Sequence, residues 1–321
     1  MSPFLVVATA SADYPIDLPT FQAALEGVAA VECSAVPYHP MDSLEEDAAI
    51  VGLASADGIF VRVGYLGAQL IADLPRLKVI TLHGVGVDQV NLAAAAARGI
   101  VVTNVPGANA QAVAEHTIGL ILAVLRHTPF ADSQMRRGAW ARARLVGEEL
   151  EGKTLGIVGL GNIGRRVAAL GQAFGMTVIA HSPRVTPPPG IISMDLELLL
   201  AAADIVSLHA PQNPQTEGLL SAERLSLMKP TAILINTARG ALVDEVALAQ
   251  ALTAGRLAGA GLDVFTVEPP DRASPLLRLP NVVITPHIGS STTGALRNIA
   301  RRAGEDMARV LRGQPPLHRV C

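Results

Sequence analysis

Short apolar runs alternate with amphipathic stretches along the first hundred residues. The runs predict strands at residues 4–8, 31–36, 58–61, 78–82 and 101–103. Helical patterns lie between them, for example over residues 91–98, where Asn91 can cap the helix and Gly99 can end it. Parallel strands need a crossover segment between them, so this alternation predicts a parallel α/β sheet.

The same alternation begins again near residue 153. Strands are predicted at residues 154–159, 177–181, 205–208, 233–236, 259–263 and 282–285. A helix is predicted over residues 162–174, and a last long helix over residues 292–311 has no strand after it. That helix is expected to pack back on the first sheet, which would make the first domain discontinuous in sequence.

The segment between the two sheets has a different pattern. Residues 110–126 are apolar on nearly every face, which predicts a helix buried on all sides, between domains or between subunits. Residues 136–151 are polar and rich in arginine, and they include Trp140, the only tryptophan.

Composition narrows the class of protein. The chain has 321 residues, enough for two domains, and is 50% apolar but only 3% aromatic, as in aliphatic parallel-sheet cores. A formal net charge of −3 gives no reason to expect nucleic acid or an anionic membrane as a partner. Cys33 and Cys321 match no metal or redox spacing. The N-terminus lacks a basic signal region and residues 118–125 are too short to span a bilayer, so a cytoplasmic location is expected.

A glycine-rich turn, GLGNIG at residues 159–164, follows an apolar strand and opens a helix. Gly159 permits the tight turn, Gly161 lets the backbone approach a pyrophosphate, and Gly164 lets helix and strand pack closely. The helix N-terminus attracts phosphate. The turn therefore predicts a dinucleotide site.

The end of the next strand bears on the choice of nicotinamide cofactor. NAD-binding versions carry an acidic residue there, whereas this chain has Ser182, 23 residues after Gly159, followed by Arg184. No carboxylate repels a 2′-phosphate, and Arg184 can pair with it. NADP is therefore favoured, and NAD remains open.

Three segments in the second half supply an arginine, a carboxylate and a histidine: residues 236–240, 263–269 and 286–289. Arg239 leaves the carboxyl end of a buried strand, where it can bind a substrate carboxylate with two hydrogen bonds or pair with Asp244 or Glu245. Glu268 can orient His287 and stabilise its charged form, as a proton donor requires.

Two further histidines follow strands. His209, in the segment 208–211, is expected to be a cofactor-loop or structural residue. His83 precedes the segment 84–88, in which Gly84 and Gly86 expose backbone N–H groups that can bind a substrate carboxylate, but an exposed loop explains His83 equally well.

Taken together, these motifs resemble the D-isomer-specific 2-hydroxyacid dehydrogenase family, and within it the glyoxylate/hydroxypyruvate reductases. The resemblance rests on residues 84–88, residues 112–115, the glycine-rich turn and the three segments in family order. It implies two Rossmann-like doubly wound parallel-sheet domains with the active site in the cleft between them. The substrate domain would be residues 1–102 and 291–321, and the dinucleotide-binding domain residues 103–290. A homodimer is also implied, built largely through the arm that runs from the buried helix at residues 110–126 to Glu151.

The resemblance also implies roles for individual residues. Arg239 would bind substrate, Glu268 would orient the histidine, and His287 would donate the proton. The implied cofactor contacts are Gly159, Gly161, Asn162, Ile163, Gly164, Ser182, Arg184, His209, Pro211, Thr216, Thr237, Ala238, Asp263 and Gly289. The implied substrate contacts are His83, Val85, Gly86 and Arg239.

The expected function is transfer of a hydride from NAD(P)H to a small 2-oxo acid, which gives a D-2-hydroxy acid. Glyoxylate or hydroxypyruvate is favoured, because Trp140 lies where such reductases reach into a neighbouring subunit. A D-3-phosphoglycerate dehydrogenase is the alternative enzyme, for which Arg62 and His83 are the candidate phosphate-binding groups. A dinucleotide-sensing, corepressor-like binding protein is the alternative of another class.

Overall fold

A computed structural model describes residues 4–35, 53–140 and 142–321. The last residue of the strand expected at 31–36 lies outside these ranges. The chain forms two compact units, Met1–Asn109 with Ser291–Cys321, and Ala110–Ser290. The first division falls after Asn109 rather than after residue 102, which lies inside a strand of the first sheet.

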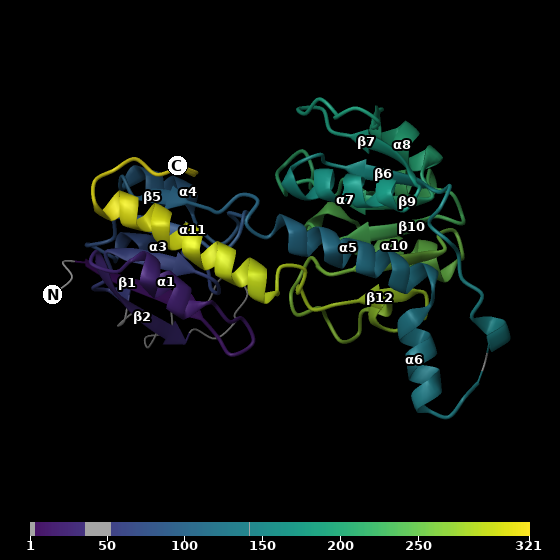
Figure 1. Cartoon of the computed structure of the whole chain (residues 1–321), viewed down its shortest axis with the longest axis horizontal. Helices are drawn as coiled ribbons and strands as arrows, with labels where there is room; N and C mark the ends of the chain where they lie inside the picture. Colours follow the sequence, from purple (N-terminus) through teal and green to yellow (C-terminus); the bar gives the residue numbers. More distant parts are fainter. Residues whose placement is uncertain (1–3, 36–52, 141) are drawn as a thin grey trace. The chain divides into compact units, whose positions relative to one another are not determined.

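The first unit contains a five-stranded parallel sheet in the order β2-β1-β3-β4-β5 (Figure 1). In register, Val6 lies between Val31 of β2 and Gly58 of β3. The strands are β1 Phe4–Ala10, β2 Ala29–Ala35, β3 Gly58–Val61, β4 Val79–Leu82 and β5 Val101–Thr103. The helices are α1 Leu18–Ala24, α3 Ala68–Ala72, α4 Leu92–Ala97 and α11 Thr293–Leu311.

Both faces of this sheet are buried, which explains why its strands are continuous apolar runs. On one face Phe21 of α1 and Ile299 and Met307 of α11 pack together. On the other face Ile59 and Ile80 of the sheet meet Ile71 of α3. The predicted α4 cap is confirmed, since Asn91 Oδ1 accepts from Ala94 N at 3.0 Å and Gly99 has a positive φ of 68°.

The long C-terminal helix packs in the first unit, as predicted. The residues that follow it also make contacts with the first unit, which the sequence did not predict. The buried Asp306 carboxylate accepts from the backbone N–H groups of Leu317 and His318, at 2.5 and 3.0 Å. Arg319 then forms an antiparallel bridge with Thr103 of β5. The last residues therefore add a bridge to the edge of the sheet, which the short polar pattern after residue 311 did not indicate.

The second unit contains a seven-stranded parallel sheet in the order β12-β11-β10-β9-β6-β7-β8. The strands are β6 Thr154–Val158, β7 Thr177–His181, β8 Ile192–Ser193, β9 Ile205–Leu208, β10 Ile233–Asn236, β11 Gly259–Leu262 and β12 Val282–Ile284. The helices are α5 Ala110–Leu125, α6 Thr128–Arg136, α7 Asn162–Ala173, α8 Leu196–Ala202, α9 Ala222–Ser226 and α10 Glu245–Thr253. Short 3-10 turns are η1 Arg142–Arg144, η2 Gly240–Leu242 and η3 Pro275–Leu277.

Two apolar clusters cover the two faces of this sheet. One joins α5 and α7 to the strands through residues such as Ile121, Val167 and Ile235. The other joins α8 and α10 to the opposite face through residues such as Leu199, Leu248 and Leu234. From β6 the chain builds outward through β7 and β8, then returns to β9 on the other side of β6. That reversal is a switch point of the kind where α/β sheets bind ligands.

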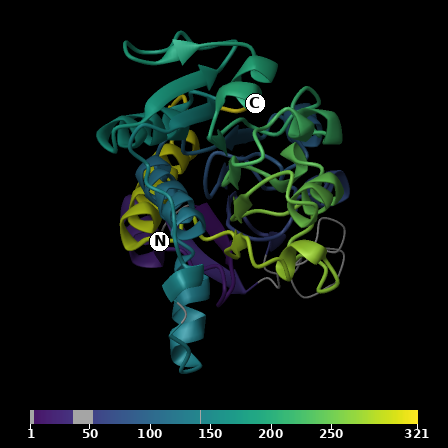
Figure 2. The same ribbon diagram turned by 90° about the vertical axis from the view of Figure 1, so that its right-hand side faces the viewer.

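The segment from α5 to residue 151 differs from its prediction. Gln111, Glu115 and Gly119 of α5 are exposed at four-residue spacing, so this helix is not buried on all sides. The helix α6, whose mixed polar pattern gave no clear signal, extends away from the rest of the second unit in both views (Figures 1 and 2). No helix among the described residues is both long and apolar enough to cross a membrane.

The contact between α11 and α1 depends on a glycine. A Cβ at Gly304 would lie 2.6 Å from Ala24 Cβ, whereas a Cβ at Gly294, in the same helix, meets nothing within 4 Å. Gly304→Ala should therefore destabilise the first unit by about 1–3 kcal/mol, because the helices must move apart. Gly294→Ala, near the start of the same helix, adds a methyl group in open space and should leave the midpoint of thermal unfolding unchanged or raised. Equal midpoints for the two variants would contradict this packing.

Candidate active site

The glycine-rich turn has the close approaches that its sequence predicts. Gly159 has a positive φ of 99°, and a Cβ there would lie 2.8 Å from the backbone of His209 and Ala210. A Cβ at Gly164 would lie 2.0 Å from Gly159 O, whereas one at Gly161 meets nothing within 4 Å. The space beside Gly161 and the N-terminus of α7, which no side chain caps, fit a pyrophosphate.

Ser182, at the end of β7, lies directly beside this turn. Its hydroxyl accepts a hydrogen bond from Leu160 N at 3.2 Å. Arg184 follows on an exposed segment. This is the position from which a residue contacts the adenosine ribose in dinucleotide folds, so the alignment of Ser182 with the usual acidic residue is structurally consistent.

The loop after β9 lies against the same turn and is internally bonded. Thr216 Oγ1 donates to Pro211 O at 2.6 Å and accepts from Asn213 N at 2.9 Å, so it closes the loop. His209 Nε2 lies 2.9 Å from Ser207 Oγ, while its buried Nδ1 has no hydrogen-bond partner among the described residues. Burial lowers the pKa of His209 to about 3, so its imidazole is neutral.

Arg239 lies on a hydrogen-bonded turn that follows β10. Asn236 Nδ2 donates to Arg239 O at 2.9 Å, and Ala238 N donates to Asn236 Oδ1 at 3.0 Å. The Arg239 guanidinium is half-buried, and its Nη1 donates to Ala238 O at 2.7 Å. Of the two carboxylates considered as alternative partners, Asp244 caps α10 through Ala247 N, and Glu245 Oε1 accepts from Thr266 N.

Thr237, between these residues, is tied to helix α5. Its hydroxyl lies 3.0 Å from that of Thr117, which itself donates to Val113 O at 2.7 Å. Since the Thr117 proton is already used, Thr237 is the donor between the two hydroxyls. The Thr237 hydroxyl therefore holds the β10 turn against α5.

Gly240 joins the arginine segment to the glutamate segment. A Cβ there would lie 1.9 Å from Phe265 C and 2.1 Å from Thr266 N. Only glycine allows the two backbones to approach so closely. The turn that presents Arg239 and the loop that leads to Glu268 are therefore packed backbone to backbone.

Glu268 and His287 are in contact, as the order of their segments led us to expect. Glu268 Oε2 lies 2.7 Å from His287 Nδ1, and Glu268 Oε1 accepts from Phe265 N at 3.1 Å. Nδ1 is the hydrogen-bond donor to the carboxylate, which leaves Nε2 for another partner. The His287 side chain is 40% exposed, so its ring is open to a ligand.

Asp263 holds the segment that carries His287. Its buried carboxylate accepts from Thr285 Oγ1 at 2.6 Å, from Ile288 N at 2.9 Å and from Gly289 N at 2.8 Å. Its backbone oxygen accepts from His287 N at 2.8 Å, and His287 has a left-handed φ of 53°. Asp263 and Gly289 are bonded to each other in support of His287, and their predicted contact with the cofactor stays a prediction.

His116 of α5 completes this cluster and was missed in the sequence. Its Nε2 lies 3.0 Å from Thr285 Oγ1 and 3.3 Å from Asp263 Oδ1. Because Thr285 donates its own proton to Asp263, His116 Nε2 is protonated and donates to Thr285. Burial alone would raise the pKa of Asp263, but hydrogen bonds from His116, Thr285, Ile288 and Gly289 outweigh it and lower the pKa. The carboxylate thus stabilises the fold above its ordinary pKa, and this contribution is lost as the pH falls through the lowered value.

The remaining predicted residues lie in the first unit. His83 is buried, so the exposed-loop interpretation is wrong, and neither ring nitrogen has a hydrogen-bond partner among the described residues. Burial and the nearby Arg62 charge hold the pKa of His83 well below its ordinary value. Val85 is 45% exposed, its carbonyl accepts from Asn104 Nδ2 at 2.9 Å, and the loop continues into Gly86. No cluster of three metal-ligating side chains occurs in the part of the chain that the structure describes.

The family is defined by comparison with known proteins. The NAD-binding domain of the D-isomer specific 2-hydroxyacid dehydrogenases matches residues 118–289. The D-3-phosphoglycerate dehydrogenase of Mycobacterium tuberculosis is 44% identical over 277 residues, which are 85% of this chain and 52% of that protein. The chain therefore belongs to the D-isomer-specific 2-hydroxyacid dehydrogenase family, as its motifs suggested, and spans about half the length of the curated relatives it matches.

Solved structures agree with this assignment. The TT0316 protein from Thermus thermophilus has a TM-score of 0.89 and 40% identity, over 99% of this chain and 100% of that one. An NADPH-dependent glyoxylate/hydroxypyruvate reductase from Sinorhizobium meliloti, solved with NADP and malonate, has a TM-score of 0.84 and 32% identity, over 98% and 96%. The predicted α/β class with two parallel, Rossmann-like sheets is confirmed.

The approach at Gly240 gives a direct test of the site's architecture. Gly240→Ala should push the Phe265–Thr266 backbone away, and with it Glu268, because 1.9 Å leaves no room for a methyl group. We expect at least about 2–4 kcal/mol of destabilisation in urea unfolding, the range of severe overpacking. Gly119→Ala, on the open side of α5 in the same unit, is the control and should be neutral or stabilising. A Gly240→Ala protein as stable as the control would contradict this geometry.

Proposed function

We propose that this protein catalyses the NAD(P)H-dependent interconversion of a small 2-oxo acid and a D-2-hydroxy acid. The observation that supports this most strongly is the 2.7 Å contact between Glu268 Oε2 and His287 Nδ1, beside the turn that presents Arg239. These residues supply an imidazole bonded to a carboxylate, after β12, and a guanidinium, after β10, and both of these strands pair with β11.

Each side chain has a distinct role in the proposed reaction. The bound nicotinamide supplies the hydride to the carbonyl carbon. Arg239 binds the substrate carboxylate through two parallel hydrogen bonds. His287 Nε2 donates a proton to the ketone oxygen as it becomes a hydroxyl, and Glu268 stabilises the imidazolium before the transfer. In the reverse direction, neutral His287 accepts the hydroxyl proton.

Two substrate classes are supported by different observations. Glyoxylate or hydroxypyruvate needs only one anion-binding group, which Arg239 provides, and similar solved structures include glyoxylate reductases. A phosphorylated substrate needs a second cation. In the first unit, the buried Arg62 Nε has no hydrogen-bond partner among the described residues, and the curated relatives are named D-3-phosphoglycerate dehydrogenases.

A panel of substrates tests the proposal. Glyoxylate, hydroxypyruvate and 3-phosphohydroxypyruvate would each be assayed with NADH and NADPH. Where the product is chiral, its configuration would be determined. Turnover to a D-2-hydroxy acid supports the enzyme, and the highest kcat/KM identifies its substrate class. Nucleotide binding without turnover of any 2-oxo acid would favour the alternative, a dinucleotide-sensing protein.

Removal of the proton donor gives the sharpest test of roles. His287→Ala should lower turnover by about 10²–10⁴-fold, the usual contribution of general acid catalysis, and leave cofactor affinity largely unchanged. His127→Ala is the matched control, since His127 also has a left-handed φ of 53° but lies exposed at the start of α6. If His287→Ala kept more than half of wild-type turnover under conditions where chemistry limits the rate, the assignment would be wrong.

We further propose that NADP is the preferred cofactor, because Ser182 carries no charge and Arg184 follows it. Replacing Ser182 by Asp should keep an oxygen acceptor near Leu160 N and set a negative charge against the 2′-phosphate. Like charges at close range in a partly hydrated site cost on the order of 1–4 kcal/mol, so preference should move toward NADH by tenfold or more. The measurement is the ratio of kcat/KM with NADPH to that with NADH. A wild type that strongly prefers NADH would refute the NADP preference.

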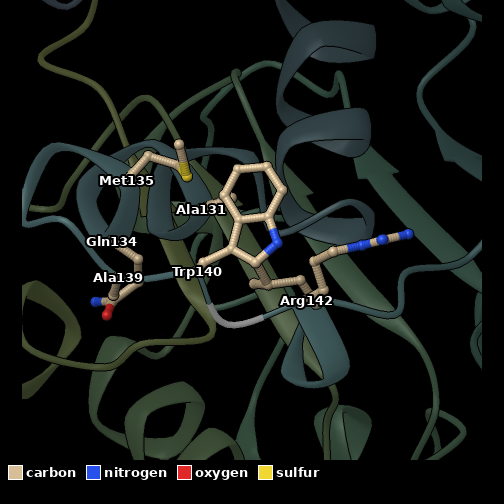
Figure 3. A pocket seen from close by; sticks show the side chains of 7 residues that line it. Ala131, Gln134, Met135, Ala139, Trp140 and Arg142 are labelled. Carbon is tan, nitrogen blue, oxygen red and sulfur yellow. The ribbon is translucent and has the colours of Figure 1, made fainter.

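We also propose a homodimer formed through the arm from α5 to residue 151, and a cytoplasmic location in keeping with two free cysteines. Exposed apolar side chains gather on this arm, with Phe130 at 41%, Met135 at 53%, Trp140 at 74% and Val146 at 80% exposure. Figure 3 shows the Trp140 ring between Met135 and Arg142, in a pocket that the side chains of α6 and η1 line. Large exposed apolar groups in one place indicate an interface.

Trp140→Glu should therefore weaken the dimer, because it places a charge at the centre of the proposed interface. Sedimentation velocity at micromolar protein should show a dimer for wild type and a larger monomer fraction for the variant. Leu198→Glu, at a 62% exposed position on α8, is the control and should not change the mass. A monomeric wild type would contradict the dimer.

A further inference from the structure

The backbone of Leu160, inside the glycine-rich turn, is hydrogen-bonded through both its N–H and its carbonyl group. Its N–H donates to Ser182 Oγ at 3.2 Å, as described above. Its carbonyl accepts from Arg165 Nε at 3.0 Å. Arg165 lies in the first turns of α7 and is exposed. The backbone of one residue thus brings the Arg165 guanidinium and the Ser182 hydroxyl to the same turn.

The Arg165 hydrogen bond uses only Nε, and no other hydrogen bond of Arg165 is found among the described residues. Its two Nη groups are therefore available to a ligand in an orientation that the Leu160 contact fixes. Arg166, the next residue, differs in this respect. Its Nη1 donates to Gln111 Oε1 at 2.8 Å, which turns it toward α5.

The stretch of chain that forms this turn carries positive charge. Between Glu151 and Asp195 the sequence has no acidic residue, whereas Arg165, Arg166 and Arg184 all fall within that stretch. Glu197, which follows the stretch, is bound by Arg224 at 2.9 and 3.1 Å. An anion beside Ser182 would therefore meet cations on the chain that surrounds it.

We infer that Arg165 is a specificity-determining residue that binds the 2′-phosphate of NADP, together with Ser182 and Arg184. This inference rests on the proposed nicotinamide-dependent function and adds a residue from the start of α7. A planar guanidinium held by Nε presents its two Nη groups to phosphate oxygens. A ribose 2′-hydroxyl offers no charge for it to bind, so Arg165 should discriminate between the two cofactors.

The test uses nucleotide fragments, so that it does not depend on turnover. Calorimetric titration of the full chain with 2′,5′-ADP and with 5′-AMP compares ligands that differ only in the 2′-phosphate. We expect wild type to favour 2′,5′-ADP, and Arg165→Gln to weaken it by roughly tenfold or more while 5′-AMP changes by less than twofold. Arg165→Lys keeps the charge but not the planar guanidinium, so its affinity for 2′,5′-ADP should lie between those of wild type and Arg165→Gln. Arg166→Gln is the matched control and should leave both affinities unchanged.

The outcomes separate this inference from the proposed function. If wild type favours 2′,5′-ADP and Arg165→Gln leaves that preference intact, the role of Arg165 is wrong and the NADP preference stands. If Arg165→Gln weakens the binding of both nucleotides equally, Arg165 supports the turn and does not recognise the 2′-phosphate. If wild type binds the two fragments equally, both the NADP preference and the role of Arg165 are wrong.

Discussion

The buried carboxylate of Asp263 is the group on which the proposed active site most depends. It follows β11 and bonds to the hydroxyl of Thr285 and to the N–H groups of Ile288 and Gly289, so one side chain fixes the whole turn after β12. That turn places His287 in a left-handed conformation, which a residue with a Cβ adopts only when its surroundings hold it there. The contact between His287 and Glu268 therefore depends on a residue that need not touch the substrate.

A second constraint is the close approach of backbones at glycines. Gly159 brings the glycine-rich turn against the loop of His209, and Gly240 brings the turn of Arg239 against Phe265 and Thr266. Because these contacts involve backbone atoms, they cannot adjust as flexible side chains do. The segments that carry Arg239 and Glu268 are thus set relative to each other by backbone atoms, which are present whatever the neighbouring side chains are. Sites with such rigid supports suit a reaction in which the reacting atoms must be held in a narrow geometry.

Many features of the fold and of the candidate site could be predicted from the sequence, because they depend on local sequence patterns. Apolar runs located every strand of both sheets except β8, which has two residues and no such run, and the strand ends located Arg239 and His287. The contact of Glu268 with His287 was expected only from the order of their segments. His116 was missed, although it directly follows the segment 112–115, because its partner Thr285 is 169 residues away in the sequence. Helix α6 and the bridge of Arg319 to Thr103 were missed for a related reason, since short mixed segments take their structure from distant contacts.

The most direct measurement of the central claim is the turnover of Asp263→Asn. The amide cannot accept at both of its terminal atoms, so the turn after β12 should loosen and His287 should leave Glu268. We expect kcat for 2-oxo acid reduction to fall by at least about tenfold, within the range for loss of a positioned acid catalyst. The affinity for 5′-AMP, which we propose binds beside the glycine-rich turn, should stay within twofold of wild type. A variant with wild-type kcat would show that the position of His287 does not depend on Asp263, and would contradict this account.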